Sequence, residues 1–168
     1  IAPSNSMFCM IDGILYDKQV TTIVQVTASI PNNVVIPDGV TTIPSFAFAE
    51  CMELESVCLP DGINHIGESA FQNCVQLAEI EIPASVTSIS VRAFEGCRNL
   101  REVMIPDGVT NIGYDAFAEC SALQKVNLPS KLTYINQDLF YNCRSLRYVE
   151  IPNGVTKICN GAFYMCSA

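Results

Sequence analysis

The sequence predicts a β-rich α/β solenoid in which the chain winds into stacked coils of 23 residues. Three residue types recur with this period. A solenoid needs such repetition because each coil buries its apolar side chains only against the neighbouring coils. The recurring residues are a proline (Pro37, Pro60, Pro83, Pro106, Pro129 and Pro152), a phenylalanine (Phe48, Phe71, Phe94, Phe117, Phe140 and Phe163) and a cysteine (Cys51, Cys74, Cys97, Cys120, Cys143 and Cys166).

The first half of each coil predicts a short strand, as the coil that begins at Leu77 illustrates. Ile80 and Ile82 stand two residues apart, so both side chains point to one side of an extended chain. Pro83 then ends the strand because it has no N–H to donate to a ladder.

The second half of the same coil predicts an opposite wall and a corner. Val86 and Ile89 predict a second extended segment. The spacing of Ala93, Phe94 and Cys97 fits a single helical or 3₁₀ turn, too short to be a true helix.

Coils that stack about 4.8 Å apart superpose their identical residues into columns. The phenylalanine column is therefore expected to form a continuous aromatic spine. Leu139 replaces a small alanine of the other coils, so we expect it to push the fifth coil outward.

The six recurring cysteines are predicted to be free thiols. Their side chains would point in parallel, whereas a disulfide requires Cβ atoms that converge to about 3.8 Å. Cys9, Cys58 and Cys159 lie outside this series, and Cys58 is expected to face solvent. The chain has no Cys-x-x-Cys pair and only one histidine, His65, so neither zinc nor another metal is predicted. We expect His65 simply to be exposed.

Residues 1–30 do not follow the repeat and are predicted to form a capping β-hairpin region. Asp12-Gly13 between apolar residues is a strong hairpin signal, and Thr21 to Val26 reads as a further extended stretch. Residues 31–168 then form the array of about six coils, with the C-terminal coil truncated. The chain reads as a piece of a longer protein whose leader and anchor lie outside it.

Composition argues against several functional classes. The net charge is −8, and residues 1–84 contain Lys18 as their single base. No basic stripe exists for binding nucleic acid, and no apolar run approaches the roughly 18 residues of a membrane helix. We find no credible nucleophile–base pair, phosphate-binding loop or cofactor motif, so an enzyme is not predicted.

The repeat resembles the BspA-like, or treponemal-type, leucine-rich repeat family. The resemblance rests on I-P-x-G-V-T-x-I and A-F-x-x-C at residues 36–51, 82–97, 105–120 and 151–166, and on the segment from Ile11 to Lys18. It implies a leucine-rich-repeat solenoid whose first strands form a parallel concave sheet, with short convex strands behind. It also implies a cell-surface or secreted protein that acts in adhesion to host proteins, or in self-association.

Binding is expected on the outward positions of the concave strands, which vary from coil to coil. Glu79, Glu81 and Glu102 would stand together with no base between them, either for solubility or to meet a basic partner. Met104 and Tyr148 are candidate anchors. The full candidate surface is Ser56, Cys58, Glu79, Glu81, Glu102, Met104, Lys125, Asn127, Tyr148 and Glu150.

The predicted function is therefore non-enzymatic binding of a protein ligand through the concave face, as a cell-surface or secreted adhesion or host-interaction module. An intracellular adaptor, or a structural spacer within a larger protein, is the alternative. Abundant unpaired thiols favour a reducing setting, which keeps that alternative open.

Overall fold

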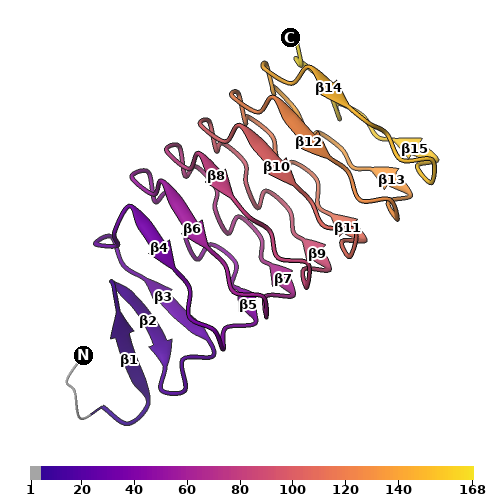
Figure 1. Cartoon of the computed structure of the whole chain (residues 1–168). Coiled ribbons are helices and arrows are strands. Elements are labelled where there is room, and N and C mark those ends of the chain that lie inside the picture. Colours follow the sequence, from indigo (N-terminus) through magenta and orange to yellow (C-terminus); the bar gives the residue numbers. More distant parts are fainter. Residues whose placement is uncertain (1–4) are drawn as a thin grey trace.

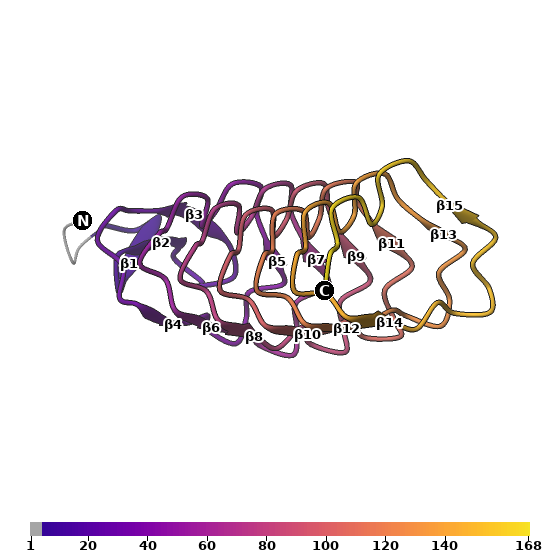
Figure 2. The same ribbon diagram turned by 90° about the horizontal axis from the view of Figure 1, so that it is seen from above.

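The computed structural model describes residues 5–168, which wind into coils stacked along one axis (Figures 1 and 2). Where strands of neighbouring coils pair, they run parallel and are offset by 23 residues, so that Val57 lies opposite Ile80 and Ile66 opposite Ile89. The predicted solenoid is confirmed. The first strand ladder contains β4 (Asn33–Val35), β6 (Ser56–Cys58), β8 (Glu79–Ile80), β10 (Glu102–Met104), β12 (Lys125–Asn127) and β14 (Tyr148–Val149).

The second ladder lies on the opposite wall and consists of two-residue strands. Each strand buries its isoleucine in the first five coils, for example Ile43 and Ile66, which have no exposed surface. The strands are β5 (Thr42–Ile43), β7 (His65–Ile66), β9 (Ser88–Ile89), β11 (Asn111–Ile112), β13 (Tyr134–Ile135) and β15 (Lys157–Ile158).

The corner contains no helix anywhere in residues 5–168, so the predicted helical or 3₁₀ turn is wrong. Two residues per corner, four positions apart, have positive φ, such as Ser69 at 50° and Asn73 at 57°. This geometry turns alternate N–H groups toward the next coil: Phe71 N donates to Ala93 O at 2.8 Å, whereas Ala70 N bonds within its own turn. A helix would have kept those donors inside the coil.

The aromatic spine is confirmed. Adjacent rings stack with centroids 5.2 Å apart for Phe48 and Phe71, and 5.3 Å for Phe71 and Phe94. The separation widens to 5.9 Å between Phe117 and Phe140, in the coil that carries Leu139. The second ladder also breaks there, between β11 and β13. The fourth and fifth coils are therefore further apart on this side, whereas β10 and β12 stay paired, and an outward shift of the fifth coil stays a prediction.

The recurring cysteines hold the coils together through hydrogen bonds. The Cys97 thiol donates to Phe71 O at 3.2 Å, and the same bond recurs from Cys74, Cys120, Cys143 and Cys166 to the phenylalanine carbonyl 26 residues earlier. All nine cysteines are free thiols, and Cys58 is exposed as expected.

The N-terminal region forms a three-stranded antiparallel sheet of β1 (Phe8–Ile11), β2 (Ile14–Asp17) and β3 (Ile23–Val26). The predicted hairpin is confirmed, with Asp12 and Gly13 at positive φ in its turn. This sheet stands at the N-terminal end of the stack (Figure 1) and adds buried side chains to the same core. Residues 1–4 of the predicted cap lie outside the described residues, and the domain boundary after residue 30 stays a prediction.

Candidate protein-binding face

The outward side chains of the first ladder form one surface, here called the ladder face: Ser56, Cys58, Glu79, Glu81, Glu102, Met104, Lys125, Asn127, Tyr148 and Glu150. Strand geometry sends alternate side chains to opposite sides. The inward neighbours Val57, Ile80, Val103 and Val126 are accordingly buried. Eight of the ten outward residues are exposed, while Ser56 and Asn127 are half-buried.

The ladder is interrupted in the middle of this face. β4, β6 and β8 form one sheet and β10, β12 and β14 another, rather than the single sheet predicted. The break lies where Glu79 and Glu102 would stand directly opposite each other, and like charges in that position weaken strand pairing.

Two open hollows span this break. One has a volume of about 470 Å³ and is lined by Ser56, Cys58, Glu79, Glu81 and Glu102 over an apolar floor. The other, of about 640 Å³, shares Glu81 and Glu102 and extends to Met104. The acidic side chains thus border both hollows.

The acidic group is smaller than the sequence predicts. Lys125 Nζ lies 2.5 Å from Glu102 Oε1, so a base from the next rung does reach this group. Lys125 stands beyond the three carboxylates rather than between them, and its ion pair neutralises Glu102 alone. Glu79 and Glu81 form no ion pair with any residue of the described chain.

The Asn127 side chain bonds to the backbone of the neighbouring coil instead of presenting its polar atoms to solvent. Its side chain accepts from Ile105 N at 2.7 Å and donates to Ile105 O at 3.0 Å, which links the two coils one residue beyond the end of β10. Ser56 Oγ is likewise engaged, at 2.6 Å from Asn33 Oδ1. Neither polar group is free for a ligand.

The two predicted anchors are both exposed, Met104 by 53% and Tyr148 by 69%. They do not lie on neighbouring rungs, because β12 stands between β10 and β14. Tyr148 is the direct neighbour of Lys125. A ligand that contacts both anchors must therefore cross the rung of Lys125.

His65 is not simply exposed, as the sequence suggested. It is half-buried, with Nδ1 at 2.7 Å from Ser88 Oγ and Nε2 at 3.3 Å from Ser90 Oγ. The sequence offered a signal, because Ser88 fills the same slot one period later. Within residues 5–168 no carboxylate bonds to the ring, so the cluster lacks the orienting group of a catalytic triad.

The described residues contain no group of three histidine, cysteine or acidic side chains arranged to bind a metal ion. They also contain no helix with the length and apolar character needed to span a membrane.

Comparison with known families agrees with this geometry. Residues 27–144 match the model of the BspA type leucine rich repeat region in six copies. The chain belongs to the BspA-type leucine-rich repeat family. No curated protein matches the chain.

Solved structures of bacterial leucine-rich repeat proteins are similar to this family member. A protein of Bacteroides ovatus is 32% identical with a TM-score of 0.78, covering 94% of this chain and 41% of its own. The leucine-rich repeat protein of T. pallidum is 25% identical with a TM-score of 0.68, covering 99% and 89%. A leucine rich cell surface protein of Faecalibacterium prausnitzii is 27% identical with a TM-score of 0.51, covering 82% and 52%. The chain thus spans about two fifths of the B. ovatus protein.

Proposed function

We propose that this chain is a non-enzymatic scaffold that binds a protein ligand on its ladder face, the face predicted to be concave. The observation that carries the proposal is the contrast between two slots of one strand. The inward slot holds only valine or isoleucine, whereas the outward slot changes from Ser56 to Glu79, Glu102, Lys125 and Tyr148 along the stack. Packing explains the constant slot, and the varied slot is free for recognition.

The same proposal places the protein on the cell surface or outside the cell, as an adhesion or host-interaction module. The similarity to the F. prausnitzii cell surface protein supports this placement. An intracellular adaptor or spacer is favoured instead by the nine free thiols, since disulfides are scarce in reducing compartments. The parent reading frame separates the two: a signal peptide and surface anchor support adhesion, and a fused signalling domain supports the adaptor.

The recess around Glu79 and Glu81 is proposed to receive a basic side chain of the ligand. Both carboxylates are exposed and border the hollow of about 470 Å³. Complementary charge raises the association rate and selects the partner more than it adds raw affinity.

Charge reversal tests this recess. The Glu79→Lys/Glu81→Lys variant is expected to lose binding to the protein ligands that the wild type retains from an array of purified surface and matrix proteins. The control Asp38→Lys/Glu68→Lys makes the same change in net charge at exposed positions outside both hollows. Both variants should keep the wild-type melting temperature. Equal binding by the two variants would refute the recess.

A further inference from the structure

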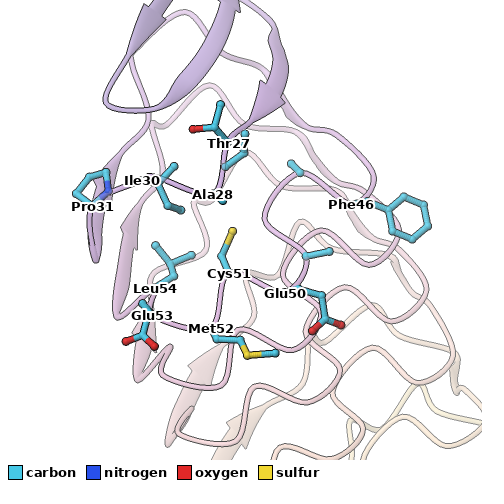
Figure 3. A pocket seen from close by; sticks show the side chains of 13 residues that line it. Thr27, Ala28, Ile30, Pro31, Phe46, Glu50, Cys51, Met52, Glu53 and Leu54 are labelled. Atoms are coloured by element: carbon cyan, nitrogen blue, oxygen red, sulfur yellow. The ribbon is translucent and has the colours of Figure 1, made fainter.

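The first corner of the array borders a groove between the N-terminal sheet and the first coil. It has a volume of about 490 Å³ and lies between residues 26–31, which follow β3, and residues 46–54. Figure 3 shows the Cys51 sulfur pointing into this space toward Thr27 and Ala28, while the Phe46 ring projects outward at the rim.

The interior coils show what normally fills the equivalent place. There the preceding corner donates alternate N–H groups to three carbonyls of the following corner. Between the second and third coils, the bonds run from Ser69 N to Val91 O, from Phe71 N to Ala93 O and from Asn73 N to Glu95 O, at 2.8–2.9 Å.

The first corner offers the same three acceptors without the donors. The carbonyls of Ser45, Ala47 and Ala49 occupy the equivalent positions, and no donor in residues 5–168 bonds to them. The Cys51 thiol has no acceptor in that part of the chain either, unlike the next five thiols of its series. Ala47 and Cys51 are half-buried, whereas their counterparts one coil later have no exposed surface.

Phe46 is a second, independent sign that this corner is built for contact. It has φ of 61° and is 58% exposed. The equivalent residue of every later corner also has positive φ, so the exposed aromatic ring rather than the backbone distinguishes this position. The later coils place small, polar or charged residues in this slot: Ser69, Arg92, Asp115, Asp138 and Gly161.

We propose that this groove binds a polypeptide segment of a protein partner, which continues the stack as one further corner. Alternate N–H groups of its backbone donate to the Ser45, Ala47 and Ala49 carbonyls. One of its backbone carbonyls accepts a hydrogen bond from the Cys51 thiol. Recognition through backbone pairing at an open edge is an established mode of peptide binding. The rim ring of Phe46 packs against the bound segment.

The geometry also restricts the occupant. Phe48 is fully buried already, so the central residue of the segment must be small rather than another aromatic. Proline is excluded from the donating positions because it has no N–H. Two copies of this chain meeting groove to groove would set carbonyl against carbonyl, so a symmetric dimer does not satisfy the site.

A corner peptide taken from this chain provides the probe. It is a macrocycle with the sequence of residues 67–74 in which Phe71 is replaced by alanine, so that it presents the donors of the second corner. Carbonyl chemical shifts of the isotope-labelled protein are followed during titration with this peptide. We expect the largest shifts at Ser45, Ala47 and Ala49, and none at Ala70 or Ala93, whose carbonyls are already paired.

Three variants make the test decisive. N-methylation of the donating residues of the peptide should weaken binding at least about tenfold, the effect of one lost hydrogen bond. Ala28→Trp, which fills the groove, should do the same, whereas Ser29→Trp beside it should not, because Ser29 does not line the groove. Glu79→Lys/Glu81→Lys should bind the peptide as the wild type does. The groove proposal and the ladder-face proposal can therefore be refuted independently of each other.

Absence of binding at millimolar peptide, or binding that survives N-methylation, would overturn the proposal. Shifts confined to the ladder face would overturn it as well. Melting temperatures of Ala28→Trp and Ser29→Trp, measured alongside, confirm that both variants remain folded.

Discussion

The corner and the ladder face of each coil follow opposite rules. Inward-facing corner slots repeat the same residue, as Phe71, Phe94 and Phe117 do, and these side chains have no exposed surface. Ladder-face slots on the same coils differ in chemistry along the stack, and most of them are exposed. The difference shows that the stack itself selects residues only where a side chain must fit between two identical neighbours. On the ladder face, where side chains meet solvent, packing between coils does not restrict which residue is present.

The largest effect is expected from breaking the spine. Phe94→Ala should destabilise the protein by about 3–5 kcal/mol, because a buried ring that stacks on both neighbours leaves a cavity. Tyr148→Ala on the ladder face should change stability by less than about 0.5 kcal/mol, the usual range for exposed sites. Urea unfolding followed by circular dichroism measures both. Similar losses in the two variants would erase the distinction between corner and face.

A smaller effect is expected at the cysteines. Cys97→Ala removes a fully buried sulfur and its bond to Phe71 O, and should cost about 1–2 kcal/mol. Cys58→Ala, at an exposed position, is the matched control and should be nearly neutral. Urea midpoints in the presence of reductant provide the comparison. A larger loss from Cys58→Ala than from Cys97→Ala would contradict the role of the recurring thiols.

The smallest effect concerns pH. Burial raises the pKa of Cys97 above the ordinary thiol value of 9.0. The neutral thiol therefore supports the fold fully below pH 9, and stability falls above it because only the unfolded chain releases the proton. One such thiol should contribute a loss of about 0.7 kcal/mol between pH 8.5 and pH 9.5. Cys97→Ala should lose correspondingly less over that interval, and an identical decline in both proteins would refute the linkage.

Periodicity predicted the coils, the aromatic spine and the free thiols, because stacked identical units require each of these features. The hairpin followed from Asp12-Gly13, a purely local signal. In each case one residue type, repeated or adjacent, determines the geometry.

Other features depend on pairs that the sequence does not display together. The corner dihedrals arise because alternate N–H groups must reach the next coil, and residues as different as Phe46, Arg92 and Gly96 adopt them. The bond from His65 to Ser88 and the ion pair from Lys125 to Glu102 each join positions 23 residues apart. Comparing equivalent slots of neighbouring coils would have suggested both. The groove at the first corner can be recognised only in the structure, where the carbonyls of that corner lack the donors that the interior coils provide.

Excision of one complete coil tests most directly whether 23 residues form one structural unit. Removing residues 79–101 joins Ala78 to Glu102 in the same register as before. The shortened protein is predicted to unfold cooperatively, with an unchanged shape of the circular dichroism spectrum. The slope of its unfolding free energy against urea concentration should fall in proportion to the shorter chain. Removing residues 79–89 instead should abolish cooperative unfolding, because the wall and corner of the next coil lose their register. Equal behaviour of the two deletions would contradict the stacked-coil account.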